Sequence, residues 1–484
     1  MVKPYKVALL VFLLFVVITT PVMGLGYGST AGGYKVWGEN STEKYVHIPA
    51  IYIAISGDRY PVVAISANAF YNYRYLLAVT FDSTSCLNQV KTRAFANCTR
   101  LTTIVLPNTV SVIEHIAFSG CTQLSVFRMP EEIATIGLGA FRNCSSLPSA
   151  IFTGTKLQTI EDYAFQDCSS LTTVTFSYGG LKTMGNFAFL NCSKLTEIAL
   201  PYTVTTIGKY AFMGCSEMTS FKGPGTPVIG RLPEGVFADC AKLRSVTNIP
   251  YVLVVAKRAL QGCAELTTID RLDSLKTIEE GAFRGCAKLE SFSLSKKLMS
   301  VGDSAFMGCA SLKEIAFPDK EDEILVGTNA FDGCASLESA TLPRNIPAIQ
   351  PCTFRDCKSL RSITIPVSVT AKIGDSAFYG CTALDSVTSL TEAPHKFGKN
   401  AFTNISDKCV LRVPYGKKAA YLAKGWTESV FKGGVIELPA PEGIHPVRVT
   451  ADGKGAWFDL EGREVLRPEK GRIYIHKGRK VLVK

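Results

Sequence analysis

The chain is poor in the residue types and motifs from which catalytic and metal sites are usually built. Among 484 residues there are five histidines and three tryptophans, and 19% of the residues are charged. No HExxH, Gly-x-Ser-x-Gly, Walker or GxGxxG motif occurs, and no CxxC pair supports a zinc site. These absences argue against a hydrolase, a nucleotide-binding enzyme and a zinc protein. The sequence therefore predicts no enzyme activity, no cofactor and no metal site.

Long apolar runs are scarce as well. The first extends from Val7 to Ile18 behind two lysines, and small residues follow it up to Gly24. This run is too short to span a bilayer, which takes about 20 apolar residues, and no later segment reaches that length. The pattern is typical of an export signal over residues 1–24. We expect a secreted or cell-surface protein with no spanning helix after the signal is removed.

The excess of positive charge is uneven. The formal net charge is +11, and residues 443–484 hold ten Lys or Arg against five Asp or Glu. A basic balance can favour nucleic acid or acidic surfaces. The rest of the chain lacks a basic stripe interleaved with aromatic residues, so nucleic acid is not an expected partner.

What the chain has in abundance is repetition. The phrase Ala-Phe-x-x-Cys-x-x-Leu recurs every 23 to 25 residues, from Ala94 to Leu384. Its thirteen cysteines are Cys98, Cys121, Cys144, Cys168, Cys192, Cys215, Cys240, Cys263, Cys286, Cys309, Cys334, Cys357 and Cys381. Self-similarity at a period of roughly 20 to 29 residues indicates a leucine-rich solenoid, in which each coil stacks on its neighbours.

The residues of one coil explain why it would stack. Leu101, Ile104 and Leu106 form a Leu-x-x-Ile-x-Leu run rich in β-branched residues, which predicts a short strand. Pro107 ends the strand because proline has no N–H for a central ladder. The Ala and Phe of the next phrase fill the space between layers. Each large side chain buried in this way stabilises the stack by roughly 1.5–3 kcal/mol.

We interpret the repeat cysteines as buried, unpaired thiols. Sixteen cysteines in an exported chain would normally suggest disulfides, but thirteen of them occur one per coil, three residues after a Phe or Leu. Equivalent side chains of adjacent coils lie about 4.8 Å apart and point the same way. That is farther than the roughly 3.8 Å between the Cβ atoms of a disulfide. The state of Cys86, Cys352 and Cys409, which lie outside the repeat register, is left open.

The repeat phrase continues into Ile-x-Leu-Pro and Val-x-x-Ile-Gly, as in residues 198–201 and 204–208. This sequence resembles the BspA-like class of leucine-rich repeats over residues 67–405. The resemblance implies an α/β repeat: a right-handed solenoid of about 13–14 coils with a parallel β-sheet. It also implies adhesion to host matrix proteins, host cell-surface proteins or other bacterial surfaces.

The two ends differ from the repeats, as solenoid ends must if they are to protect the edges of the stack. Residues 25–66 alternate apolar and polar side chains and are predicted to form a β-rich cap. Residues 406–438 resemble the closing segment of the class, and residues 439–442 are expected to be a linker.

Residues 443–484 are predicted to form a separate small β module. A hairpin with a turn at Glu461-Gly462 and a second turn at Lys477-Gly478 are expected from the pattern. The segment is similar to carboxy-terminal modules of secreted Bacteroidetes proteins, including those that serve in sorting or attachment. A small β cap with a solvated basic face is an equally good interpretation.

One outward position of the repeat has a consistent chemistry. Ten of the thirteen residues that lie five positions after a repeat cysteine carry a hydroxyl. The candidate binding residues are Thr103, Thr173, Ser220, Ser245, Thr268, Ser291, Ser339 and Ser362, and the row also holds Val126, Ser149, Glu197, Glu314 and Ser386. Solvated strand residues that stack well would give the same pattern. The functional alternative is an extended concave surface with many weak contacts, because the row lacks the aromatic and Arg anchors typical of hot spots.

Two kinds of function remain. The first is an exported interaction or adhesion protein whose partners are proteins. The second is a glycan-binding or nutrient-capture surface protein, which the hydroxyl row would suit. Against the second, Trp37, Trp426 and Trp457 all lie outside the repeats, so no tryptophan platform for sugars is expected along them.

Overall fold

The structure of the chain is a computed structural model, which describes residues 24–439 except 40, 178, 226–229 and 271, and parts of 445–483. The expected export signal lies outside the described residues apart from its last position, as does most of the expected linker at 439–442.

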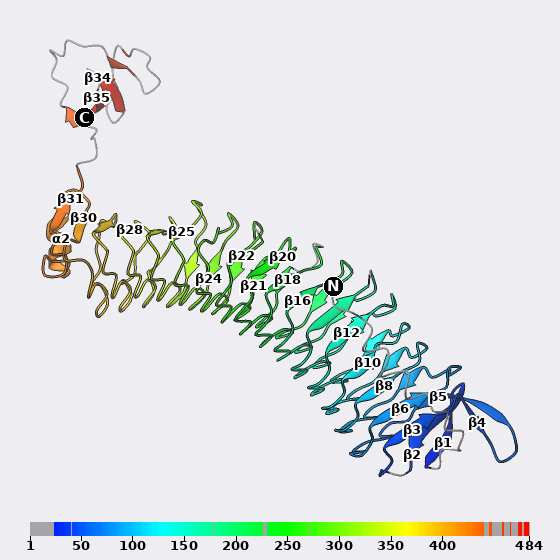
Figure 1. Cartoon of the computed structure of the whole chain (residues 1–484). Coiled ribbons are helices and arrows are strands. Elements are labelled where there is room, and N and C mark those ends of the chain that lie inside the picture. Colours follow the sequence, from blue (N-terminus) through cyan, green and yellow to red (C-terminus); the bar gives the residue numbers. More distant parts are fainter. Residues whose placement is uncertain are drawn as a thin grey trace, which may run out of the picture.

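The described repeats form a curved solenoid of stacked coils (Figure 1). One side of the stack is a row of parallel strands, which we call the long-strand face. Its strands are β3 (Tyr45–Ile48), β6 (Ala78–Phe81), β8 (Thr103–Val105), β10 (Val126–Arg128), β12 (Ser149–Phe152), β14 (Thr173–Phe176), β16 (Glu197–Ala199), β18 (Ser220–Lys222), β20 (Ser245–Thr247), β22 (Thr268–Ile269), β25 (Glu314–Ala316), β27 (Ser339–Thr341), β28 (Ser362–Ile365), β29 (Ser386–Ser389), β30 (Val410–Val413) and β31 (Val435–Glu437). Between β22 and β25, the coil of Ser291 contributes a single bridge to Glu314.

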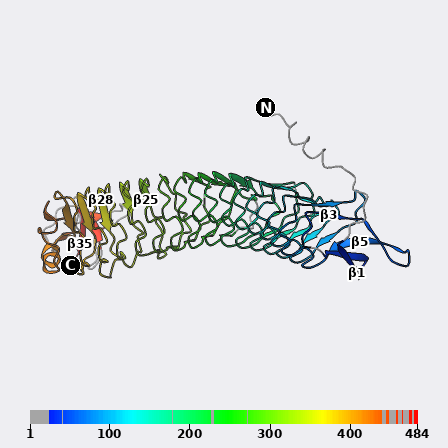
Figure 2. The ribbon, with the colours of Figure 1, turned by 60° about the horizontal axis from the view of Figure 1, so that its bottom comes forward.

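A second row consists mainly of two-residue strands and is called the short-strand face. Its strands are β7 (Gln89–Val90), β9 (Val112–Ile113), β11 (Thr135–Ile136), β13 (Thr159–Ile160), β15 (Thr183–Met184), β17 (Thr206–Ile207), β19 (Arg231–Leu232), β21 (Val254–Val255), β23 (Thr277–Ile278), β24 (Ser300–Val301) and β26 (Leu325–Val326). At the N-terminal end, β1 (Leu25–Thr30), β2 (Gly33–Gly38) and β5 (Arg59–Ile65) continue this row. β4 (Ile51–Ile53) pairs with β5 in a hairpin that projects from the stack (Figure 2).

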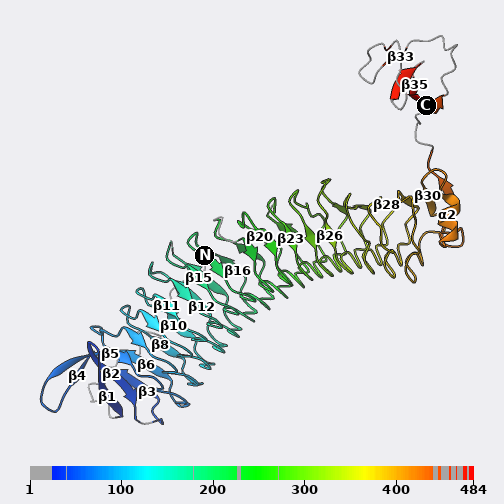
Figure 3. The same cartoon turned by 180° about the vertical axis from the view of Figure 1, so that it is seen from behind.

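The expected parallel-strand solenoid is confirmed, with about 17 turns instead of 13–14. The larger number arises because both ends stack in the same ladder as the repeats: β3 pairs with β6, and β30 pairs with β31. Almost no helix is present among the described residues. The helix α2 (Lys418–Ala423) lies near the C-terminal end of the arc, beside β30 (Figure 3). The half of each coil that would be helical in an α/β repeat therefore consists of turns.

The third side of each coil is the turn that contains the Ala-Phe-x-x-Cys phrase, and we call this side the turn face. The N–H groups of Arg93, Phe95 and Asn97 donate to carbonyls of the next coil at 3.0, 2.7 and 2.7 Å. Arg93 and Asn97 have φ values of +55° and +61°, so the turn alternates between right- and left-handed backbone. The three inter-coil hydrogen bonds satisfy the backbone where no strand is present.

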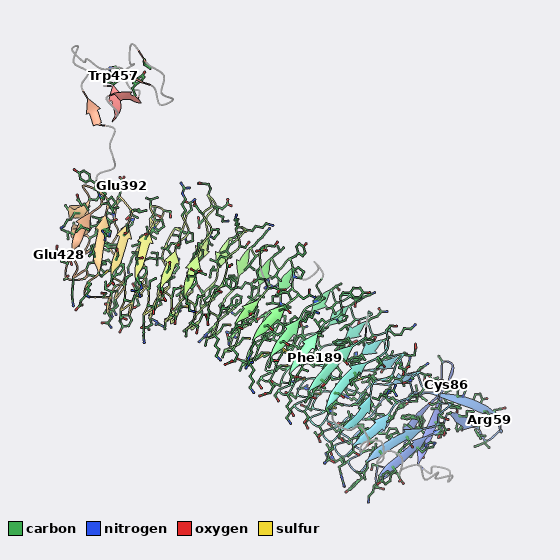
Figure 4. The ribbon with its side chains drawn as sticks, turned by 45° about the horizontal axis from the view of Figure 1, so that its top comes forward. Arg59, Cys86, Phe189, Glu392, Glu428 and Trp457 are labelled. Atoms are coloured by element: carbon green, nitrogen blue, oxygen red, sulfur yellow. The ribbon has the colours of Figure 1, made fainter. Side chains whose placement is uncertain are left out.

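The core is a column of phenylalanine rings. Phe95, Phe118 and Phe141 stack nearly parallel with ring centroids 5.1 and 5.3 Å apart. The same arrangement continues through Phe189, in the middle of the arc (Figure 4), as far as Phe237. Leu260 interrupts the column and is itself fully buried. The predicted register, with each Phe and Cys facing inward, is confirmed.

Two stretches of the repeats, residues 219–234 and 318–327, depart from the repeat phrase but do not end the stack. β18 pairs with β20 beside the segment 219–234, and β24 pairs with β26 across the segment 318–327. After residue 444 the described strands are β32 (His445–Val447), β33 (Trp457–Phe458), β34 (Ile473–His476) and β35 (Arg479–Val483). They form a sheet in the order β32-β35-β34-β33. β34 and β35 are antiparallel. The turns expected at Glu461-Gly462 and Lys477-Gly478 lie outside the described residues.

Candidate functional surface

The hydroxyl row predicted from the sequence lies in register along the long-strand face. Thr103 pairs with Val126, Ser149 with Thr173, and Ser339 with Ser362. The candidate residues lie in β8 (Thr103), β14 (Thr173), β18 (Ser220), β20 (Ser245), β22 (Thr268), the bridge position (Ser291), β27 (Ser339) and β28 (Ser362). The structure therefore brings these positions together as one line.

The hydroxyls of this row are available to solvent. Thr173, Thr268, Ser291, Ser339 and Ser362 are exposed, whereas the other three candidates are half-buried. Within the described part of the chain, hydroxyls of the row make side-chain hydrogen bonds only at Thr173 and Ser386. A row of unpaired hydroxyls can make adaptable contacts, each of them weak.

Sequence analysis missed a group of apolar side chains on the N-terminal part of the same face. Tyr45, Val105, Val126 and Ile151 protrude from β3, β8, β10 and β12, and we call them the N-terminal patch. Their exposed fractions are 58%, 51%, 44% and 47%. Val105 and Ile151 follow the hydroxyl row by two residues, so strand alternation directs both side chains outward.

Polar groups border this patch. His47 lies next to Tyr45 on β3 and its ring nitrogens contact the Thr80 hydroxyl and the Asp82 carboxylate, both at 2.9 Å. Arg128, paired with Val105 across β8 and β10, forms an ion pair with Glu131 at 3.0 Å. The patch thus combines exposed apolar side chains with a tyrosine, an arginine and a histidine.

The repeat cysteines cannot act as surface nucleophiles. All sixteen cysteines are free, and the thirteen repeat cysteines are buried, as the sequence predicts. Burial raises the pKa of Cys240 and Cys309 to about 12. A thiolate is the reactive form of cysteine, so these thiols stay protonated and inert near neutral pH. Of the cysteines outside the register, Cys86 is exposed and lies in the N-terminal part of the stack (Figure 4).

The turn face carries a shallow polar groove over the first coils. Its volume is about 690 Å³. It is lined by residues on either side of the repeat cysteines: Asn97, Thr99, Gly120, Thr122, Asn143, Ser145, Asp167, Ser169, Asn191, Ser193 and Gly214. We call it the turn-face groove. Three Asn-Cys-Ser/Thr triplets contribute to this lining, and a groove at these positions was not predicted from the sequence.

Comparison with known proteins identifies the repeats. The profile of the BspA type leucine rich repeat region matches residues 59–155, 139–251, 226–325 and 324–416, which together span more than half of the chain. The chain belongs to the BspA-type leucine-rich repeat family. Leucine-rich repeats are a fold commonly used for protein–protein interaction. No curated protein sequence matches the chain.

Several solved structures resemble this BspA-type chain in fold. A leucine-rich repeat protein from Bacteroides ovatus is 23% identical with a TM-score of 0.44, and the match covers 82% of this chain and 99% of that one. A leucine rich cell surface protein from Faecalibacterium prausnitzii is 22% identical with a TM-score of 0.42, over 84% and 96% of the two chains. The pneumococcal vaccine antigen PcpA is 15% identical with a TM-score of 0.36, over 87% and 98%.

None of the helices in the described part of the chain has the length and apolar character needed to cross a membrane. Among those same residues there is no group of three or more His, Cys, Asp or Glu arranged to hold a metal ion.

Proposed function

We propose that this BspA-type protein is exported and binds proteins of the host matrix, of host cells or of other bacterial surfaces through its long-strand face. The observation that carries the proposal is the N-terminal patch: Val105, Val126 and Ile151 are exposed on three successive coils of one face, and Tyr45 is exposed on the same face two coils before Val105. Aromatic and apolar side chains surrounded by polar groups are typical of the centre of a protein interface. Solenoids of stacked repeats commonly use such an extended face for binding.

The hydroxyl row extends this surface toward the C-terminal end. Thr173, Thr268 and Ser339 are exposed on successive parts of the row. Because a hydroxyl both donates and accepts, the row suits a partner with backbone or polar side-chain groups along its length. In the proposed arrangement the patch supplies most of the affinity, and the row supplies orientation.

The test is binding of the purified protein to immobilised matrix proteins, measured by surface plasmon resonance. A double variant, Val105→Arg with Ile151→Arg, should weaken binding at least tenfold because it places two charges in the apolar centre. The matched control is Leu325→Arg on the short-strand face, where Leu325 is 54% exposed. Equal binding by the double variant and the wild type would contradict the proposal. Binding to a glycan array with no binding to proteins would favour the nutrient-capture alternative.

The proposal includes export by residues 1–24 and a sorting or attachment role for residues 443–484. Its support is the signal-like pattern of the first segment and the resemblance of the second to carboxy-terminal modules of secreted Bacteroidetes proteins. Removal of residues 443–484 should transfer the protein from the cell surface to the culture medium, as followed by immunoblotting of the two fractions. Unchanged surface retention would leave the module with a capping role only.

A further inference from the structure

The turn-face groove is a second exposed surface of the molecule, built on a different side of the coil from the N-terminal patch. Its floor is formed at the position directly before each repeat cysteine. This position has positive φ throughout the groove, with Asn97, Asn143, Asp167 and Asn191 at +57° to +61°. Asn97 leans over the next coil, where its Oδ1 lies 2.6 Å from the place that a Cβ on Gly120 would occupy. The glycines of the groove therefore leave room for the amide of the preceding coil.

Much of the hydrogen-bonding capacity in the groove is unused by the protein. Asn97 and Asn143 are exposed, and their carboxamides make no hydrogen bond within the described part of the chain. Asn191 donates from Nδ2 to Oδ1 of Asp167 at 2.9 Å, which fixes that pair and leaves the Asn191 carbonyl free to accept. The result is a line of amide and carboxylate groups oriented along the groove.

The hydroxyls that line the turn-face groove, one position after each repeat cysteine, are oriented by hydrogen bonds to backbone carbonyls. Thr122 donates to the carbonyl of Thr99 at 3.2 Å, and Ser145 donates to that of Thr122 at 3.2 Å. Ser169 and Ser193 repeat this contact at 3.5 Å. Because these four hydroxyls donate their protons inside the protein, their oxygens keep acceptor lone pairs for a ligand. A ligand that offers many O–H donors fits this surface.

The spacing of the coils selects the class of ligand. Phe95, Phe118, Phe141, Phe165 and Phe189 stack beneath the groove at 5.1 to 5.3 Å per coil. An extended peptide repeats a side-chain direction only about every 6.6 Å, since a strand rises about 3.3 Å per residue, so it would lose register after a few coils. An extended β-1,4-linked sugar chain also turns each successive sugar over, but its two-sugar repeat is close to two coil spacings, so it presents the same hydroxyls to every second coil and stays in register.

The charge of the groove lining narrows the class of ligand further. The lining contains no Lys, Arg or His and a single carboxylate, Asp167. An anionic polymer would meet no compensating cation within the groove, and the carboxylate would repel it. We propose that the turn-face groove binds a neutral, extended, linear glycan with about one sugar per coil.

The later coils of the same chain offer a surface with which the turn-face groove can be compared. In the later coils, the positions on either side of the cysteine are small, as in Gly262-Cys263-Ala264 and Gly285-Cys286-Ala287. A Cβ placed on Gly285 or Gly308 would lie 3.7 to 3.8 Å from the glycine backbone of the preceding coil, so no side chain occupies this space. These coils have the same backbone but lack the amides and hydroxyls, so they should not bind the glycan.

The experiment measures binding of cello-oligosaccharides of two to six sugars by isothermal titration calorimetry. The triple variant Asn97→Gly, Asn143→Gly, Asn191→Gly removes three amides without backbone strain, because the adjacent coils already have glycine at this position. We expect affinity to rise with chain length and to fall at least tenfold in the triple variant. Maltohexaose, whose α-linked chain coils, should bind more weakly than cellohexaose.

The matched control is Asp239→Gly with Asp356→Gly, which makes the same change at the same position outside the groove. This variant should bind cellohexaose like the wild type. The proposal fails if no neutral oligosaccharide binds, if the triple variant binds as tightly as the wild type, or if an extended polar peptide binds the groove more tightly than cellohexaose. The patch variant with arginine at positions 105 and 151 should bind the glycan normally, so this result does not depend on the protein-binding proposal.

Discussion

At the scale of the residue, the structure explains why the buried position three residues after each repeat Phe or Leu is cysteine and not another small apolar residue. The Cys192 thiol donates to the Phe165 carbonyl of the preceding coil at 3.2 Å, and Cys215 donates to the Phe189 carbonyl at 3.3 Å. The Phe189 carbonyl also accepts the Cys192 N–H at 3.2 Å, so the thiol supplies its second hydrogen bond. Alanine would leave this lone pair unused, and valine would add volume to a close-packed column.

Replacement of a ring in the phenylalanine column tests the packing at this scale. Phe306 is fully buried and stacks on Phe283 at 5.1 Å and on Phe331 at 5.5 Å. We expect Phe306→Ala to lower the free energy of unfolding by about 3–5 kcal/mol because it opens a cavity between two coils. Phe306→Leu should cost less, since Leu260 occupies the equivalent position. Chemical denaturation followed by circular dichroism measures both, and equal stability of Phe306→Ala and the wild type would show that the register is wrong.

At the scale of the coil, the residue type at one position is determined by the left-handed backbone there. The position before each repeat cysteine holds only Asn, Asp or Gly, and the described φ values there are all positive, as at Asn97, Asp239 and Gly285. These are the residue types that tolerate left-handed backbone. The position five before the cysteine has the same handedness but accepts bulky residues, including Ile116 and Tyr163 at +58° and +59°. There the inter-coil hydrogen bonds, such as Ile116 N–H to the Leu138 carbonyl at 2.8 Å, hold the strained backbone.

The left-handed position can be tested by exchange. Gly285 has a φ of +76°, and a Cβ there would have ordinary contacts of 3.7 to 3.8 Å with the preceding coil. Gly285→Ala should therefore cost about 1–2 kcal/mol of unfolding free energy from backbone strain alone. The reverse exchange, Asp239→Gly, should change stability by at most about 0.5 kcal/mol, because glycine adopts the same conformation freely. Denaturant titration of both variants measures the difference, and a Gly285→Ala variant as stable as the wild type would contradict this account.

For the single coil, some features could be predicted from the sequence and others could not. The period located the strands and the inward Phe and Cys because apolar positions must recur wherever coils stack. It underestimated the number of turns, since the strands at Tyr45–Ile48 and Val435–Glu437 stack by backbone pairing without the repeat phrase. The outward hydroxyl row could be predicted from strand alternation. The turn-face groove could not, because it depends on which side chains lean over glycines of the next coil.

At the scale of the whole molecule, the buried thiols form a set that responds to pH together. Burial raises the pKa of twelve repeat cysteines and of Cys409 above the ordinary value of 9.0. In the solenoid each coil is stabilised by its neighbours, so a change repeated in every coil acts on the entire stack. Thirteen effects of the same sign should therefore add up to a strong dependence of stability on pH.

This dependence has a definite direction. Below about pH 9 the thiols are protonated in both the folded and the unfolded chain, so the contribution to stability is complete. Above pH 9 the unfolded chain releases these protons, whereas folded thiols such as Cys381 and Cys409 keep theirs until about pH 12. The unfolded state then binds fewer protons, and the free energy of unfolding falls as pH rises. We expect cooperative alkaline unfolding between pH 9 and 12, followed by far-UV circular dichroism in reducing buffer. A variant with Cys240→Ala and Cys309→Ala should show a shallower slope by two protons, and a slope equal to that of the wild type would contradict the role of the buried thiols.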